Sequence, residues 1–221
     1  MTSSPERRHV GVVLFPGFEL LDVFGPLEMF GVLTDEFDIV MIGPTVGEVA
    51  SAQGPRVVAD VSYEGAPAVD IVVVPGGIGT RALVNDQSFL GWLKGWATSA
   101  EFITSVCTGS GVLAAAGLLD GYRATSNKRS FSWASAQGAG VTWIPEARWV
   151  EDGNRWTSSG VAAGIDMALA LIAHLHGEDL ATGLADRVEY EWHRDSSWDP
   201  YAAKNGLVSP RDDGTLSVGD R

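Results

Sequence analysis

The chain contains 221 residues, enough for one large α/β domain spanning 1–221 that buries about 70 per cent of the surface of its unfolded form. Its 28 acidic and 15 basic residues leave a net charge of −13, which would repel polyphosphate, so we expect no nucleic-acid partner. The single cysteine cannot form an intrachain disulfide, and neither a signal peptide nor a membrane-length apolar run is evident. These properties predict a cytoplasmic protein without a membrane partner.

The first third of the chain predicts strands, turns and one helix. A β-branched run at 9–15 predicts a short strand that Pro16-Gly17 ends. Pro26 suits the first turn of a helix, which places Asp22 in the connection before that helix. A second strand and a hairpin are expected at 37–42 and 56–59.

The rest of the chain alternates apolar strands with helices. The continuous apolar run 70–74 is typical of a central parallel strand, and it ends in Pro75-Gly76-Gly77. The further elements expected are a helix at 87–98, a strand at 102–106, a helix ending at Asp120-Gly121, a short strand at 123–125, a helix at 128–137, two or three strands within 141–158, and helices at 160–176 and 179–190.

This alternation predicts an α/β sandwich, with a mainly parallel central sheet and helices on both faces. Its core is expected at about 9–190, followed by a surface-wrapping tail from Arg194. Sites in such sheets lie at the carboxyl ends of strands. Three segments occupy such ends: 16–22, 75–77 and Cys107.

Cys107 stands where a strand ends and a helix opens, the position of a nucleophile elbow. The first amides of that helix, from Thr108 and Gly109, lack intrahelical partners and carry the positive end of the helix dipole. A thiolate is stabilised there, as is an anion formed from its target. Free cysteines are often inert core residues, but a structural cysteine would not need this turn, so we predict a nucleophile.

Asp22 is the best candidate to manage the proton of that nucleophile. A carboxyl group buried beside a thiolate has its pKa raised by desolvation and by like charge, so it can hold a proton near neutral pH. The alternative is that Asp22 caps a helix beginning near Gly25. Gly77 and Thr108 would supply oxyanion-hole amides, although the glycines could equally serve only the turn.

Other catalytic chemistries lack support in the sequence. His9, His174, His176 and His193 occupy strand, helix or tail positions, so a Cys-His peptidase dyad is disfavoured. No cluster has the ligand spacing of a metal site. The run Gly76-Gly77-Ile78-Gly79 matches neither a Walker loop nor a dinucleotide fingerprint, so no cofactor is expected.

Several motifs follow one another along the chain: Phe15–Gly17, Leu21–Pro26, Pro75–Gly77, Ser105–Ser110 and Gly160–Asp166. With these motifs in this order, the sequence resembles the ThiJ/PfpI superfamily of glutamine amidotransferase-like proteins. Within the superfamily the likeness is greatest to bacterial isocyanide hydratases, which have Asp in the first of these conserved segments and Cys-Thr-Gly-Ser at the elbow.

The resemblance implies a flavodoxin-like homodimer without a cofactor, which hydrates an isocyanide to an N-substituted formamide. Cys107 would attack the terminal carbon of this small-molecule substrate, protonated Asp22 would deliver a proton to that carbon, and water would resolve the thioimidate. Gly77 and Thr108 would stabilise charge. The implied substrate-binding residues are Gly76, Asn127, Ser159, Gly160 and Val161.

The chain departs from this pattern at position 127, where many relatives have histidine and this sequence has Asn127. Asparagine cannot exchange protons near neutral pH, which disfavours reactions that need that base. Ser159 and Ala162 differ from the Gly and Thr expected in hydratases, which bears on the substrate. Two alternatives remain open: a glyoxalase or deglycase acting on α-oxoaldehydes, and a non-catalytic redox or ligand sensor whose thiolate oxidises.

Overall fold

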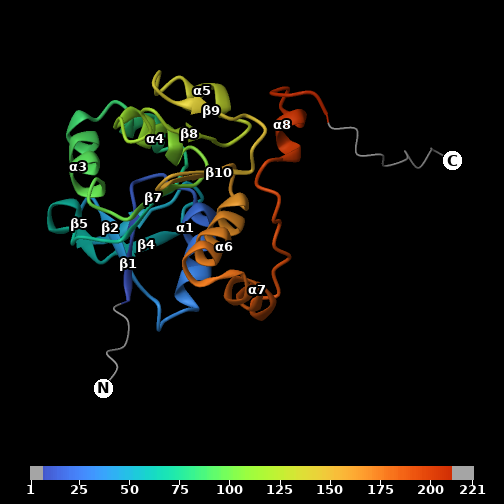
Figure 1. Cartoon of the computed structure of the whole chain (residues 1–221). Helices are drawn as coiled ribbons and strands as arrows, with labels where there is room; N and C mark the ends of the chain where they lie inside the picture. The colour runs from blue at the N-terminus through green and yellow to red at the C-terminus, as the bar shows by residue number, and fades with distance from the viewer. Residues whose placement is uncertain (1–6, 211–221) are drawn as a thin grey trace.

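The computed structural model describes residues 7–210, which form a seven-stranded sheet between helices (Figure 1). The strand order is β10-β11-β7-β6-β1-β2-β5, and every neighbouring pair is parallel except β10 and β11. The predicted mainly parallel sheet is therefore confirmed. The strands are β1 (Arg8–Val13), β2 (Phe37–Gly43), β5 (Val61–Ser62), β6 (Ile71–Val74), β7 (Phe102–Ser105), β10 (Trp149–Asp152) and β11 (Arg155–Ser158).

The middle strands are apolar because helices cover both of their faces. All four residues of β6 are buried, as expected for a strand with no solvent-facing side. In register, Val12 of β1 lies between Met41 of β2 and Val73 of β6. This register brings the carboxyl ends of β1, β6 and β7 to one edge of the sheet.

The helices pack on the two faces through small residues. On one face, Gly25 of α1 lies against Ile165 of α6, and on the other Gly11 of β1 lies under Trp96 of α3. Figure 1 shows α1 and α6 together on one side of the sheet and α3 on the other. None of the helices within 7–210 is both long and apolar enough to cross a membrane. The helices are α1 (Leu20–Gly31), α2 (Thr80–Leu83), α3 (Gln87–Ala97), α4 (Gly109–Ala115), α5 (Phe131–Ser135), α6 (Ala163–His176), α7 (Glu178–Arg187), α8 (Pro200–Lys204) and the 3-10 turn η1 (Tyr63–Gly65).

Helix α1 begins at Leu20, six residues before the predicted start at Pro26. Pro26 lies inside the helix, where it removes the amide that would donate to the Asp22 carbonyl. Packing of α1 on α6 holds the helix despite this lost bond. Asp22 consequently lies in the first helical turn rather than in a connection, and its side chain is fully buried.

Two small pairs of strands complete the fold. The predicted hairpin is confirmed as β3 (Gly47–Ala50) with antiparallel β4 (Arg56–Ala59). A parallel pair joins β8 (Arg123–Ala124) to β9 (Thr142–Trp143). The helix expected at 128–137 is shorter, since α5 starts at Phe131 and Lys128 turns its side chain into the interior.

The segment after α7 returns along the sheet edge. The Arg148 amide donates to the Ser196 carbonyl at 2.8 Å, and the Asp199 amide donates to the Glu146 carbonyl at 2.7 Å. The segment then ends in the short helix α8, at the right of Figure 1. Within 194–210 the predicted surface-wrapping tail therefore follows residues 146–148; the remainder of that prediction lies outside the described residues.

Candidate active site

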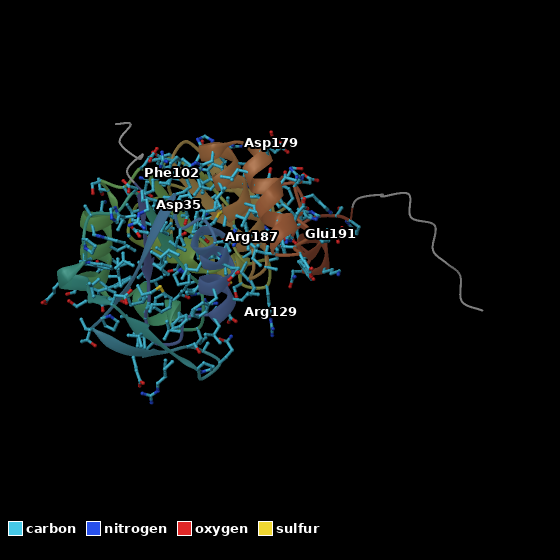
Figure 2. All side chains as sticks on the ribbon, turned by 90° about the horizontal axis from the view of Figure 1, so that it is seen from below. Asp35, Phe102, Arg129, Asp179, Arg187 and Glu191 are labelled. Carbon is cyan, nitrogen blue, oxygen red and sulfur yellow. The ribbon has the colours of Figure 1, made fainter. Side chains whose placement is uncertain are left out.

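The three segments predicted to converge do meet at one edge of the sheet. Asp22 Oδ2 accepts a hydrogen bond from the Gly76 amide at 2.8 Å, and the Cys107 thiol interacts with the same carboxyl group. Figure 2 shows the two edges of the molecule: Asp35 and Phe102 lie on one side, and Arg129 lies on the opposite side. The carboxyl ends of parallel strands thus gather the acid, the thiol and the glycine turn.

Cys107 adopts a left-handed backbone conformation, with φ 58°. This region is unfavourable for residues other than glycine, and the surrounding structure must hold it in place. The Cys107 amide donates to the Ser158 and Ser159 carbonyls at 3.2 and 3.0 Å. The Cys107 carbonyl accepts from the Ser110 and Ser126 hydroxyls at 3.1 and 2.9 Å. These bonds fix the predicted elbow.

The thiol itself lies in a nearly closed environment, with Cys107 only 7% exposed. Burial raises the pKa of the Cys107 thiol, and the Asp22 charge raises it further. The Thr108 amide, the Val161 amide and the Thr108 hydroxyl lower that pKa, but their effect is smaller. The expected stabilised thiolate is therefore wrong for the resting site, because desolvation outweighs the helix amides.

Asp22 behaves as the sequence predicted. Burial raises the pKa of its carboxyl group to about 7. The Gly76 amide and the Cys107 thiol lower this pKa, whereas the Glu19 charge raises it. The position before the helix belongs to Glu19, whose side chain makes no cap bond, so the interpretation of Asp22 as a helix cap is wrong. Its second oxygen, Oδ1, is buried without a hydrogen-bond partner. That oxygen is free to exchange a proton.

The Asp22 and Cys107 side chains form one proton-sharing unit. Below pH about 7 both groups are neutral, and above it Asp22 is a carboxylate beside a protonated thiol. A neighbouring carboxylate can accept the thiol proton as the sulfur attacks an electrophile. The arrangement therefore supports nucleophilic attack without a free thiolate in the resting state.

The glycine turn is required by close contacts. A Cβ on Gly76 would lie 2.6 Å from the Thr108 amide nitrogen and 2.8 Å from Asp22 Oδ2. Gly77 has φ 123°, which favours glycine. Its amide donates to Thr108 Oγ1 at 3.1 Å, so it is already engaged, contrary to the expectation of a free oxyanion donor. The Thr108 and Val161 amides act on the sulfur instead.

A cavity of about 350 Å³ opens onto Cys107. Arg81 lies in its wall, with its guanidinium 3.6 Å from the Trp133 ring centroid and hydrogen bonds to the Thr80 and Ser130 hydroxyls at 2.9 and 3.1 Å. Sequence reasoning missed Arg81, since nothing local marks it. The cavity is lined by Glu19, Gly77, Ile78, Arg81, Cys107, Thr108, Asn127, Arg129, Ser130 and Val161.

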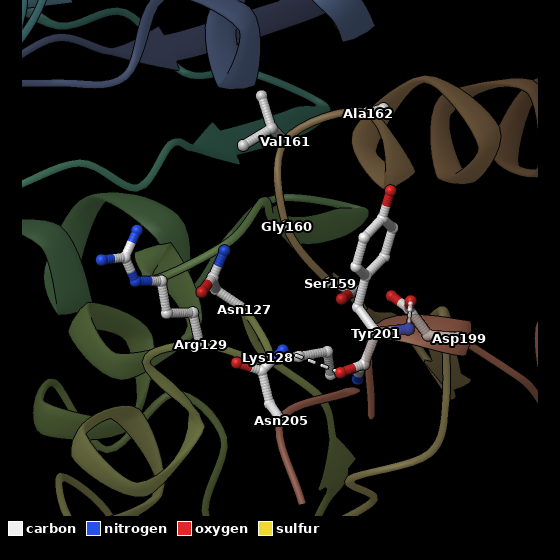
Figure 3. Close-up of a pocket in the computed structure, with 10 residues that line it drawn as sticks. All are labelled: Asn127, Lys128, Arg129, Ser159, Gly160, Val161, Ala162, Asp199, Tyr201 and Asn205. Atoms are coloured by element: carbon white, nitrogen blue, oxygen red, sulfur yellow. Dashed lines mark hydrogen bonds between the residues drawn. The ribbon is translucent and has the colours of Figure 1, made fainter. Parts of the chain in front are cut away.

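A second cavity of about 380 Å³ adjoins the first and shares Asn127, Arg129 and Val161 with it (Figure 3). It contains Ser159 and Gly160, so the structure brings four of the five predicted substrate-binding residues to these cavities. Gly76 lines neither of them, because its amide faces Asp22. The second cavity is also lined by Lys128, Ala162, Asp199, Tyr201 and Asn205.

Lys128 is a buried ammonium group that the sequence did not reveal as unusual. Its Nζ donates to Thr125 Oγ1 at 2.7 Å and to the Ala147 carbonyl at 2.5 Å. Burial lowers the pKa of this ammonium group to about 8. The charges of Asp199 and Glu146 raise the pKa, and the charge of Arg148 lowers it. Within 7–210, no three His, Cys, Asp or Glu side chains are grouped so as to hold a metal ion.

Comparison with known proteins identifies the family. A family model described as the DJ-1/PfpI family matches residues 8–174. The chain belongs to the DJ-1/PfpI family. Among solved structures, a THiJ/PfpI family protein from Pseudomonas syringae superposes on this DJ-1/PfpI protein with a TM-score of 0.77 and 32% identity, covering 86% of this chain and 79% of that one. Drosophila melanogaster DJ-1beta shares the fold, with a TM-score of 0.74, 20% identity and coverage of 85% and 100%.

Curated relatives of this DJ-1/PfpI chain differ in kind. Isonitrile hydratase of Pseudomonas putida is 37% identical over 182 residues, which are 82% of this chain and 78% of the hydratase. The HTH-type transcriptional regulator GbdR of Pseudomonas aeruginosa is 36% identical over 145 residues, 65% of this chain and 39% of the regulator. The chain thus spans less than half of the regulator's length.

Proposed function

We propose that this protein is a cofactor-independent isocyanide hydratase, which adds water to an isocyanide to give an N-substituted formamide. The buried Asp22–Cys107 pair, with the Asp22 pKa at about 7, is the observation that carries the proposal. The similarity to isonitrile hydratase supports the choice of substrate class. The terminal carbon of an isocyanide accepts both a nucleophile and a proton. Cys107 can provide the nucleophile, and Asp22 can deliver the proton.

In the first step the Cys107 sulfur forms a bond to the terminal carbon of the isocyanide. The thiol proton passes to the Asp22 carboxylate and then to that same carbon, so the elements of S–H are added across one atom. The product is a thioimidate, with a C=N bond to the substituent nitrogen and a C–S bond to Cys107. The Thr108 and Val161 amides favour negative charge on the sulfur during this step.

In the second step a water molecule attacks the thioimidate carbon. The Asp22 carboxylate accepts one proton from this water and passes it to the nitrogen, which leaves a hydroxyl group on the carbon. Collapse of this tetrahedral adduct forms the C=O bond and breaks the C–S bond, and the hydroxyl proton passes through Asp22 to the departing sulfur as the N-substituted formamide is released. Asp22 and Cys107 are then restored, and no oxidant or reductant is consumed.

The alternatives have less support. A sensor whose thiolate oxidises needs an accessible, low-pKa sulfur, whereas burial raises the pKa of Cys107. A glyoxalase reaction would need a base at position 127, and Asn127 is not one. The Asn127 side-chain oxygen Oδ1 accepts a hydrogen bond from the Ser130 amide at 3.0 Å. The likeness to the regulator covers only 39% of that protein.

We further propose a cytoplasmic homodimer in which residues 1–221 form a single domain. Leu21 and Phe24 support a second copy, since these α1 residues are 42% and 44% exposed beside the site. Sedimentation of the wild type and of Phe24→Asp would test the dimer. We expect the variant to sediment as a monomer, and unchanged sedimentation would contradict an α1 interface.

The test of the reaction is formamide production from one aryl and one alkyl isocyanide. The purified wild type should release both formamides, while Cys107→Ala and Asp22→Asn should reduce turnover by about 10³-fold or more. Asp35→Asn is the matched control, because Asp35 is exposed at the opposite edge (Figure 2). Turnover that survives Cys107→Ala, or its absence from the wild type, would disprove the proposal.

A further inference from the structure

The two cavities beside Cys107 adjoin each other through shared lining residues, and together they are called the groove. The first contains the sulfur, and the second begins at the three residues that both cavities share, Asn127, Arg129 and Val161. Figure 3 shows the segment from Ser159 to Ala162 passing between Asn127 and Arg129 on one side and Tyr201 on the other. The two volumes, about 350 and 380 Å³, exceed what the reacting isocyano group alone would occupy.

The far wall of this groove comes from the C-terminal segment. Asp199, Tyr201 and Asn205 line the second cavity, and all three lie beyond residues 8–174, the part that the family model matches. This wall therefore lies outside the segment that the family model matches. A substituent placed against it would be recognised by features that the family match does not include.

Hydrogen bonds hold the wall in position. Asp199 is only 1% exposed, its amide donates to the Glu146 carbonyl at 2.7 Å, and its carboxylate accepts from the Tyr201 amide at 2.9 Å. The Asn205 side chain donates to the Tyr201 carbonyl at 2.8 Å. The Tyr201 side chain remains 55% exposed on this fixed backbone. The Lys204 ammonium group lies 4.8 Å from the centroid of this ring, and the exposed remainder of the ring can contact a ligand.

Gly160, in the second cavity, lies close to Asn127, which lines both cavities. A Cβ on Gly160 would collide with Asn127 Nδ2. Asn127 cannot turn away freely, since its Oδ1 accepts from the Ser130 amide. The next residue, Val161, has φ 34°, a strained conformation for a β-branched residue. Its amide interacts with the Cys107 sulfur, and the residue lines both cavities.

From this geometry we infer that the substrate is an elongated isocyanide, whose carbon reaches Cys107 while an apolar substituent, aryl or arylalkyl, lies against Tyr201 in the second cavity. The inference rests on the proposed hydratase function. Val161, Ala162 and the Tyr201 ring supply the apolar contacts. Tyr201 is thus a specificity-determining residue, remote from the bond that forms.

The experiment compares ethyl isocyanide with 2-phenylethyl isocyanide in the wild type, Tyr201→Ala and a control. Tyr201→Ala should raise KM for the phenylethyl compound about fivefold, the loss of one ring contact, and should change KM for the ethyl compound less than about twofold. Val58→Ala is the control, because Val58 is an exposed apolar residue on β4 outside both cavities. Equal effects on both substrates would overturn the inference.

A second variant and a binding measurement test the same site independently. Ala162→Phe, at the start of α6, would narrow the second cavity and should also raise KM selectively for the longer substrate. Binding of N-(2-phenylethyl)formamide, followed by NMR, needs no turnover and should weaken in Tyr201→Ala. If neither isocyanide is hydrated but this binding depends on Tyr201, the hydratase proposal fails and the substituent site stands. If the formamide does not bind, or binds equally to both proteins, the substituent site is disproved.

Discussion

Asp22 and Gly76 are joined by a buried hydrogen bond, from the Gly76 amide to Asp22 Oδ2, of 2.8 Å. This bond fixes Oδ2, while Oδ1 is buried without a hydrogen-bond partner. It also joins α1 to the turn after β6, through two residues that are 54 positions apart in the chain. The Asp22 carboxyl group is therefore held by a backbone contact as well as by its interaction with Cys107.

The Asp22 carboxyl group should make the protein less stable as pH rises. Its folded pKa, about 7, lies above its ordinary value of 3.8, so the folded state binds the proton more tightly. The stabilisation is complete below pH about 4 and is lost as pH rises through about 7. Relative to Asp22→Asn, the wild type should lose on the order of 2–4 kcal/mol between pH 4 and 8, measured by urea unfolding. A constant difference between the two proteins would contradict this assignment.

The rate should have the opposite dependence on pH. Attack needs Asp22 ionised to accept the thiol proton, so kcat/KM for an isocyanide should rise as pH increases through about 7 and then level off. The raised Cys107 pKa keeps the sulfur protonated over this range. Initial rates between pH 5 and 9 would reveal the rising limb. A profile that falls through pH 7 would instead mean that protonated Asp22 and a free thiolate are the active forms.

Gly76→Ala should disturb both stability and catalysis. The added Cβ would meet the Thr108 amide nitrogen and Asp22 Oδ2, so we expect a loss of about 1–3 kcal/mol and a reduced kcat. Gly91→Ala on α3 is the matched control, since nothing lies within 4 Å of its added Cβ. That variant should gain about 0.5–1 kcal/mol, because alanine favours helix. Thermal unfolding of the two variants would distinguish the steric effect of the added Cβ at position 76 from a general effect of replacing glycine by alanine.

Lys128 should make stability increase at alkaline pH. Its folded pKa of about 8 lies below the ordinary 10.5, so the unfolded chain binds more protons between these values. Stability relative to Lys128→Met should therefore rise by about 2–3 kcal/mol from pH 8 to 10.5. Lys94→Met, at an exposed position on α3, is the control and should show no such trend. If the difference in stability between the wild type and Lys128→Met does not change between pH 8 and 10.5, the pKa of Lys128 is not lowered.

Local pattern was enough to predict most of the strands, the parallel sheet and the elbow at Cys107, but not the short edge strand β5. A continuous apolar run such as 70–74 predicts a strand that is buried on both faces, because such a strand has no side that faces solvent. The turn at Cys107 follows from a strand that meets a run of small residues, and its φ of 58° agrees. The family resemblance, carried by several motifs in order, was confirmed over residues 8–174.

Tertiary contacts decided the rest. Helix α1 starts at Leu20 because packing on α6 outweighs the missing amide of Pro26. The raised pKa of Cys107 depends on burial and on Asp22, neither of which a local pattern of helix amides can reveal. The second cavity depends on Tyr201, which lies 94 residues from Cys107 in the sequence. Sequence spacing encodes backbone periodicity, whereas desolvation and cavity shape arise only when distant segments exclude water together.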